Sequence, residues 1–178
     1  MKKILLTLSL LITINLYSSE FDNKFDNAAT KNEKCQLVEE YVQKNNGRAF
    51  YILGASYYFG DVDSICDNVR DFDMSFKYLK KSYDAGYIYS ASLLSEHYEY
   101  GKGTPKNTIL AYSTVANGYS KGDSESSMTY AYYKCIGYGT SKNCKLGKNI
   151  MRKLISSDNR LTSRRAKNIW KTWKFNDL

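Results

Sequence analysis

Apolar and small side chains recur at spacings of three and four residues along most of the chain. In residues 87–100, for example, Ser90, Leu94 and Tyr98 follow one another at intervals of four. This spacing is typical of a helix that buries one stripe of its surface. The pattern therefore predicts an all-α protein built from short amphipathic helices.

Glycine residues divide this pattern into units of thirty-six residues. Each unit contains two periodic segments, which we interpret as a helix A and a helix B joined by a glycine-containing turn. An earlier unit fits the same scheme if five extra residues are allowed between Gly60 and Asp71. A recurring interval of this length is typical of helical repeats that stack on one another. Three glycine pairs carry the period: Gly86 and Gly122, Gly101 and Gly137, and Gly103 and Gly139.

Polar residues mark the expected start of helix B in each unit. Asp71, Asn107 and Asn143 occupy equivalent positions, where a side-chain oxygen can accept from the free amides of the first helical turn. Pro105 falls in the preceding turn, where its missing amide hydrogen costs nothing. The helix boundaries therefore agree with the period.

Half-units flank the array and set the expected domain boundaries. Residues 31–45 resemble a lone helix B and residues 160–174 a lone helix A, so we expect about eight helices in all. Residues 20–30 carry no periodic signal and are predicted to be a flexible leader. Residues 175–178 are predicted to be a short C-terminal tail.

Residues 1–19 have the pattern of a secretory signal peptide. Two lysines precede an apolar run from Ile4 to Leu16, and small residues follow at Ser18 and Ser19. A helix needs about 20 apolar residues to span a bilayer, so the run is short for an anchor, although an uncleaved anchor is the alternative. We expect cleavage after Ser18 or Ser19 and a periplasmic or secreted location, without stable membrane insertion.

Composition and charge argue against most enzyme classes. The chain has 178 residues, 43% of them hydrophobic, and a formal net charge of +8. Its single histidine, His97, lacks the partners of a triad or a metal site, and we expect it on the surface or in a groove. No nucleophile stands beside a base, so we predict no catalytic, cofactor-binding or metal-ligating residue.

The repeat motif resembles the Sel-one-like (Sel1-like) repeat family, which is related to the tetratricopeptide repeats. The third unit departs from the motif, with Lys134 where a tyrosine belongs and Asp158 at the final glycine. The resemblance covers about residues 31–174 and implies a right-handed α/α superhelix, a solenoid of about three two-helix repeats with flanking capping helices. The resemblance also implies binding of other proteins, which is the main role of this family. The matching residues are Ala49, Leu53, Gly54, Tyr57, Gly60, Asp71 and Gly86 in the first unit and Ser90, Leu94, Tyr98, Gly101, Gly103, Asn107, Ala111 and Gly122 in the second.

Four cysteines allow three disulfide pairings. Cys35, near the start of the leading helix, and Cys66, in the first A–B loop, fall at the same end of neighbouring helices. Cys135 and Cys144 bracket the equivalent loop of the third unit. Cysteines two units apart could hardly meet, because a disulfide needs Cα atoms within about 7 Å. We therefore predict Cys35–Cys66 and Cys135–Cys144 bridges, with free thiols or a redox site as the alternative. The cysteine-rich exported members of the family are similar, but they usually link successive helices in nearly every unit.

The A helices of such a superhelix line its concave wall, so residues beside their buried stripe are candidates for binding a partner. Tyrosine suits an interface because its large rigid ring carries a polar tip. The alternative is that several of these rings fill the groove between helices A and B. The candidates are Tyr51, Ala55, Tyr58, Glu96, Glu99, Tyr100, Tyr132 and Tyr133.

Residues 160–174 predict a basic amphipathic helix. They contain six lysines and arginines and no acid, beside an apolar stripe that includes Trp170 and Trp173. One interpretation is contact with an acidic protein surface or an anionic lipid. The other, which we favour, is a capping helix whose tryptophans cover the last unit.

Together these features predict an exported, non-catalytic scaffold that binds another protein, as a monomer or weak dimer. The resemblance to small exported members of the family implies one specific form, an immunity protein that neutralises a secreted bacterial toxin. One alternative is a secreted host-directed effector or adaptor. A less favoured one, implied by the resemblance to cysteine-rich relatives, is a hydrolase of cell-wall fragments or β-lactams. No nucleic-acid partner is expected, because no groove-reading motif is present.

Overall fold

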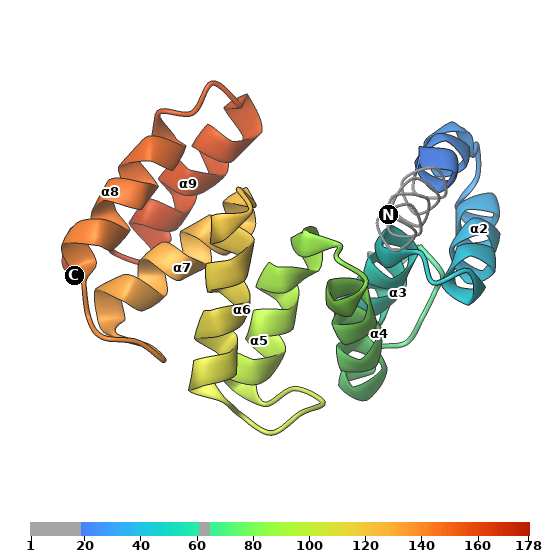
Figure 1. The fold of residues 1–178 in the computed structure, drawn as a ribbon. Helices are drawn as coiled ribbons and strands as arrows, with labels where there is room; N and C mark the ends of the chain where they lie inside the picture. The colour runs from blue at the N-terminus through green and yellow to red at the C-terminus, as the bar shows by residue number, and fades with distance from the viewer. Residues whose placement is uncertain (1–18, 61–64) are drawn as a thin grey trace, which may run out of the picture. The chain divides into compact units, whose positions relative to one another are not determined.

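The computed structural model describes residues 19–60 and 65–178, which form helices joined by turns and loops, with no β-strand in these ranges (Figure 1). The predicted signal peptide, apart from Ser19, lies outside the described residues. The chain divides into two compact units, with the boundary between Tyr87 and Ile88. Among the described helices, none is long and apolar enough to cross a membrane.

The first unit contains a helical segment at residues 19–27, followed by α2 (Lys31–Gln43), α3 (Gly47–Phe59) and α4 (Phe72–Asp84). The second unit opens with a 3₁₀ turn at Ile88–Ser90. Its α-helices are α5 (Ala91–Tyr100), α6 (Thr108–Ser120), α7 (Ser124–Ile136), α8 (Cys144–Ile155) and α9 (Arg160–Thr172). The A and B helices predicted for the three thirty-six-residue repeats are therefore α3 and α4, α5 and α6, and α7 and α8.

The capping residues begin helix B as the sequence predicts. The carboxylate of Asp71 accepts from the amide of Met74 at 2.9 Å. The amide oxygens of Asn107 and Asn143 accept in the same way at α6 and α8, at 2.9 and 3.0 Å. Each cap satisfies one of the amides that a helix leaves free at its first turn.

Glycine ends both A helices of the second compact unit, residues 88–178. Gly101 and Gly137 follow α5 and α7 with φ angles of 71° and 76°, in the left-handed region. Their amides donate to the carbonyls of His97 and Tyr133, which closes the last turn. Since a side chain is strained in this conformation, the period read in the sequence reflects a backbone requirement.

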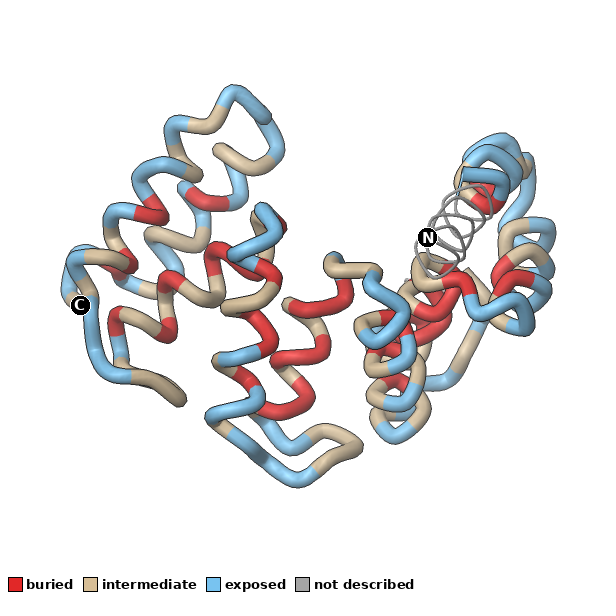
Figure 2. Tube along the Cα trace, in the orientation of Figure 1, coloured by how far each residue is buried: buried red, intermediate tan, exposed pale blue. Residues whose placement is uncertain are grey.

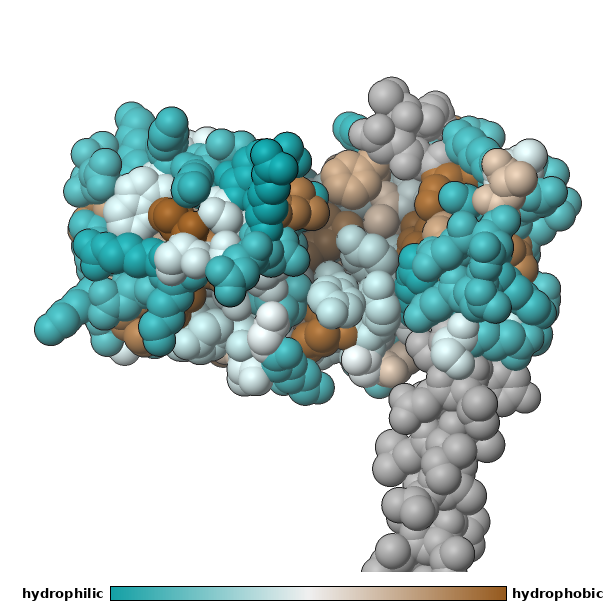
Figure 3. Space-filling model, turned by 90° about the horizontal axis from the view of Figure 1, so that it is seen from above, coloured by the Kyte–Doolittle hydropathy of each residue, from teal (hydrophilic) through white to brown (hydrophobic). Residues whose placement is uncertain are grey.

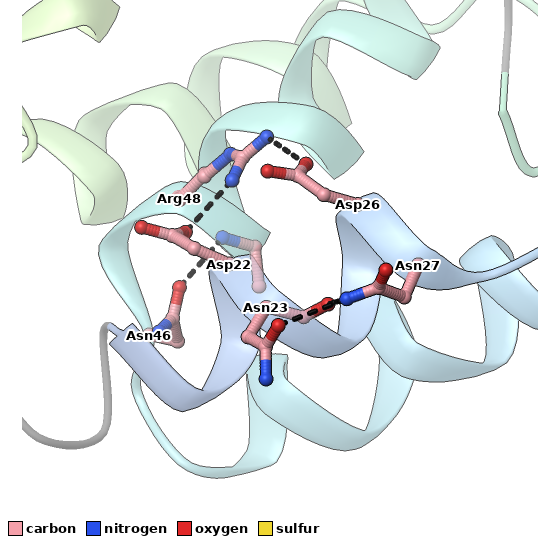
Figure 4. A network of polar contacts seen from close by, with 7 residues as sticks. Asp22, Asn23, Asp26, Asn27, Asn46 and Arg48 are labelled. Atoms are coloured by element: carbon pink, nitrogen blue, oxygen red, sulfur yellow. Dashed lines mark hydrogen bonds and ion pairs between the residues drawn. The ribbon is translucent and has the colours of Figure 1, made fainter.

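The segment predicted to be a flexible leader differs in the structure, where residues 19–27 are helical. Phe21 and Phe25 are buried, and the ring of Phe21 lies 5.0 Å from that of Tyr41 on α2. Arg48 of α3 donates to the carboxylates of Asp22 and Asp26 at 2.8 and 3.1 Å (Figure 4). The two phenylalanines are four residues apart, so a single apolar stripe holds this helix on the core.

The last residues of the chain also pack, although the sequence predicts a tail. Phe175 is fully buried and its ring stacks 5.2 Å from that of Trp170. The indole nitrogen of Trp170 donates to the side chain of Asn176 at 3.0 Å. Phe175 joins a core that includes Met128, Ile150 and Met151, so the residues after α9 are part of the core of the second unit. Figure 2 shows the buried positions along the chain in red.

Both predicted disulfides are present. Cys35 on α2 is bonded to Cys66, with their Cα atoms 5.0 Å apart. Cys135 at the end of α7 is bonded to Cys144 at the start of α8, with a Cα separation of 3.7 Å. The first bridge fastens a loop to the first unit, and the second closes the α7–α8 hairpin.

Close helix contact in the α7–α8 hairpin depends on a residue without a side chain. A Cβ atom added at Gly147 would lie 2.3 Å from the carbonyl oxygen of Ala131 and 2.8 Å from the sulfur of Cys135. Neither neighbour can withdraw easily, because one is helix backbone and the other belongs to a disulfide. Gly147 thus sets how near α8 approaches α7.

The two disulfides are expected to stabilise the protein unequally, because the bridged cysteines are 31 and 9 residues apart. On loop-closure grounds, Cys35→Ala with Cys66→Ala should lower the free energy of unfolding by about 3–4 kcal/mol, and Cys135→Ala with Cys144→Ala by about 2–3 kcal/mol. Denaturant unfolding followed by circular dichroism measures both. An unchanged midpoint for the first double variant would contradict a stabilising Cys35–Cys66 bridge.

Replacement of Gly147 by alanine should destabilise the second unit by about 1–3 kcal/mol, because helix α8 must shift to admit a methyl group. Lys145→Ala, at an exposed position of the same helix, is the matched control and should change stability by less than about 0.5 kcal/mol. Thermal melts of both variants test this. Equal stability of the two proteins would show that the hairpin relaxes without cost.

Candidate protein-binding surface

Helices α5 and α7 pack together in the second unit and bring five of the predicted residues to one region. The hydroxyl of Tyr133 on α7 donates to the carboxylate of Glu99 on α5 at 2.6 Å. Tyr138, in the turn after α7, donates to the backbone carbonyl of Glu99 at 3.2 Å. These bonds cross between two repeats and fix the position of Glu99.

Tyr133 itself is fully buried, so its prediction as a partner-binding residue is wrong. Ala131 and Cys135 are also buried but lie about 200° around the helix axis from Tyr133, so α7 is covered on two sides. Burial, and then the Glu99 carboxylate, raise the pKa of the Tyr133 hydroxyl far above its usual range. Tyr133 therefore stays a neutral donor that supports the surface from below.

The accessible part of this region consists of Glu96, Glu99, Tyr100 and Tyr132, which we call the α5–α7 face. Tyr100 is 61% exposed at the end of α5, and both glutamates are partly buried. Partial burial, and then the charges of Glu99 and Glu96, raise the pKa of Tyr100 to about 12. At neutral pH the face thus offers a neutral phenol beside two carboxylates.

Tyr132 is less available than the sequence suggests. Its ring packs 4.7 Å from that of Trp173 and 6.3 Å from that of Phe175. These contacts leave the residue only partly buried. Tyr132 thus has two roles, since its ring packs on the C-terminal residues and its partly exposed side chain belongs to the α5–α7 face.

The candidates in the first unit lie on α3 and are partly buried. The ring of Tyr51 lies 5.5 Å from that of Tyr87, and the ring of Tyr58 lies 5.5 Å from that of Phe72. Ala55 lies between them in the helix and is also partly buried. Tyr51 and Tyr58 therefore pack on neighbouring rings, which agrees with the alternative that these tyrosines fill the groove between helices.

His97 is fully buried, not on the surface or in an open groove as expected from the sequence. Its Nδ1–H donates to the carbonyl of Lys102 at 2.5 Å, which ties the turn after α5 to the helix. Burial lowers the pKa of His97, and the positive charge of Lys102 adds to this effect, while the hydrogen bond opposes it. The imidazole is a structural bond donor.

Helices α8 and α9 form a second polar surface, as Figure 3 shows on its left side. Trp170 of α9 and Trp173, which directly follows the helix, are partly buried beneath it and cover the last repeat, as the capping interpretation predicts. Arg165 pairs with Glu125 of α7, and the guanidinium of Arg152 lies 5.8 Å from the ring centroid of Trp170. The other basic residues of α9 face water.

No group of three histidine, cysteine, aspartate or glutamate side chains suited to a metal ion occurs in residues 19–60 or 65–178. The titratable groups of the α5–α7 face and of Tyr133 beneath it are carboxylates and phenols, and the pKa values of Tyr100 and Tyr133 are raised. This arrangement can donate and accept hydrogen bonds and can stack on an apolar group. Its chemistry is suited to recognition of another molecule.

Comparison with solved structures identifies the fold. A Sel1 repeat protein from Oxalobacter formigenes matches with a TM-score of 0.58 and 19% identity, over 74% of this chain and 95% of its own. A protective antigen present in uropathogenic Escherichia coli strains, which displays an SLR fold, matches with a TM-score of 0.64 and 15% identity. That match covers 89% of this chain but 34% of the antigen, so the chain spans about a third of its length.

No protein-family model matches the sequence, and no curated protein matches it either. At these low identities the structural likeness establishes the fold alone. The predicted fold class, an all-α solenoid of two-helix repeats, is confirmed.

The buried imidazole predicts a pH dependence of stability. Since burial lowers the pKa of His97, the unfolded chain binds a proton more readily than the folded protein. The stabilisation should be complete above the ordinary imidazole pKa of about 6.5 and should be lost as the pH falls through the lower folded-state value. Thermal melts between pH 7.5 and 5 should show this decline, and His97→Gln should be less stable at pH 7.5 but show a flatter profile. Parallel profiles for the two proteins would contradict the assignment.

Proposed function

We propose that the protein is an exported, non-catalytic scaffold that binds another protein through the α5–α7 face. The observation that carries this proposal is the exposure of Tyr100 beside Glu96 on a framework fixed by the Tyr133–Glu99 hydrogen bond. An aromatic ring with a polar tip, held on a rigid helix, buries a large area at little cost in conformational entropy. Such residues often dominate the energy of an interface.

Two further features support an exported protein. Disulfides persist in oxidising compartments and are rare in the cytosol, and all four cysteines are paired. Residues 1–19 have the sequence pattern of a cleaved signal peptide. We therefore infer a periplasmic or secreted location.

The finer form that we propose is an immunity protein, which neutralises a secreted bacterial toxin. A preformed, disulfide-bonded helical surface can cover a toxin without having to fold on binding. The alternative is a host-directed effector or adaptor that presents the same face to a host protein. Recovery of the protein from the culture medium would favour the effector, and inhibition of a toxin encoded beside it would favour immunity.

Site-specific photocrosslinking tests the binding face. Tyr100 replaced by a photoreactive benzoyl-phenylalanine should form a discrete crosslink to one protein in a periplasmic or medium extract. The same residue placed at Ile109, which is 68% exposed on helix α6, is the matched control and should give less than about a tenth of that yield.

A charge reversal distinguishes the face from its surroundings. Glu96→Lys should reduce the Tyr100 crosslink at least about tenfold, since it reverses the charge of a carboxylate beside the contacting ring. Equal crosslinking from Tyr100 and Ile109, or crosslinking unaffected by Glu96→Lys, would overturn the assignment of the α5–α7 face.

A further inference from the structure

We infer that helix α9 carries a second binding site, a cationic groove that takes an acidic segment of a protein partner. The groove is the face of α9 that bears Arg160, Arg164, Lys167 and Lys171. It borders a hollow of about 660 Å³ that Asn168 also lines. This site shares no residue with the α5–α7 face and does not depend on the function proposed for that face.

The four cations form one straight row. They lie at intervals of four, three and four residues, so they return to the same side of a helix with 3.6 residues per turn. At a rise of about 1.5 Å per residue, the row is about 16 Å long and its neighbouring members are about 4.5–6 Å apart along the axis. The row is therefore a linear charge pattern and suits a linear ligand.

The row is not neutralised by the protein. All four residues are exposed, and in the described part of the chain no carboxylate forms an ion pair with any of them. Asp158 lines the hollow and is the one acid there. Residues 142–174 contain eleven lysines and arginines and no acid other than Asp158, which gives them a net charge of +10.

The charge is also unevenly shared between the two units. Residues 88–178 carry fifteen basic and six acidic residues, a net charge of +9, whereas residues 19–87 carry nine and twelve, a net charge of −3. Like charges crowded on one helix oppose folding slightly through mutual repulsion. An anionic partner would remove that repulsion and gain the attraction.

The spacing favours carboxylates of a polypeptide. Side chains on one face of an extended strand repeat at about 6.6 Å, and those at positions i and i+4 of a helix at about 6 Å. Either repeat approximates the row on α9. Arginine binds carboxylates through two parallel hydrogen bonds, and the amide of Asn168 can donate to a backbone carbonyl of the bound segment.

A lipid surface fits less well. Peripheral helices usually insert tryptophan or other large apolar side chains into the membrane interface. The rings of Trp170 and Trp173 instead pack on Phe175, at 5.2 and 6.5 Å between centroids. Leu161, 49% exposed, is the large apolar side chain of α9 that faces water.

The test uses the full-length mature protein and a fluorescently labelled poly-L-glutamate of about twenty residues. Fluorescence anisotropy should detect binding that weakens as salt is raised. Replacement of Arg160, Arg164, Lys167 and Lys171 by glutamine should weaken it at least about tenfold. A matched control replaces Lys142, Lys145, Lys148 and Lys153 by glutamine, which removes the same charge from the α8 side and should weaken binding less than about threefold.

Three results would overturn the inference. Equal weakening by both quadruple variants would show that net charge, not the row on α9, attracts the polymer. Tighter binding to heparin, or to vesicles containing 30% phosphatidylglycerol, with the same dependence on the α9 row, would assign the surface to a polysulfate or a membrane.

If the α9 variant melts early, Arg164→Gln with Lys167→Gln is the replacement, and it should still weaken binding more than Lys145→Gln with Lys148→Gln. Because the Tyr100 crosslink does not involve these residues, its persistence in the α9 variant separates the two sites.

Discussion

The close approach of neighbouring helices is the constraint on which the rest of the structure depends. Helix α4 comes so near α3 that the hydroxyls of Ser75 and Ser82 donate to the carbonyls of Gly54 and Gly47, at 2.9 and 2.8 Å. Helix α8 also comes close to α7 at Gly147, where an added Cβ atom would lie 2.3 Å from the carbonyl oxygen of Ala131. Short helices of ten to thirteen residues would be marginal alone, and only contact at this distance buries enough of each to hold them.

Small residues at the helix crossings leave many of the aromatic rings to pack around them, although some large side chains, such as Tyr41 and Tyr133, are fully buried. Where alanine, serine and glycine occupy the helix crossings, aromatic rings must pack around them, and the many tyrosines do this. Tyr112, Tyr119 and Tyr130 illustrate the result, with Tyr130 stacked 5.5 and 4.6 Å from its two neighbours. Much of the tyrosine content thus serves packing, whereas Tyr100 is 61% exposed.

The same architecture separates two kinds of surface in the second unit. The face of α5 and α7 combines phenols with carboxylates, while α9 displays cations that the protein leaves unpaired. A terminal helix has a neighbour on one side only, so its outer side is polar. All charged residues of α9 are basic, and Asp158, just before the helix, is the one acid among the described residues that line its hollow, which gives a capping helix the charge pattern of a binding site.

The sequence by itself determined the features that depend on local chemistry: the thirty-six-residue period, the caps at Asp71, Asn107 and Asn143, the glycine helix ends and, through the antiparallel stacking, both disulfides. Only the tertiary structure decided which side chains are covered, since burial of Tyr133, His97 and Phe175 depends on helices distant in sequence. Phe21 and Phe25 show the same limit. Two apolar residues one helical turn apart do not by themselves predict a packed helix, and here the contacts with Tyr41 and Arg48 hold it in place. The period fixes where helices begin and end, but the neighbours of each helix fix which of its residues a partner can reach.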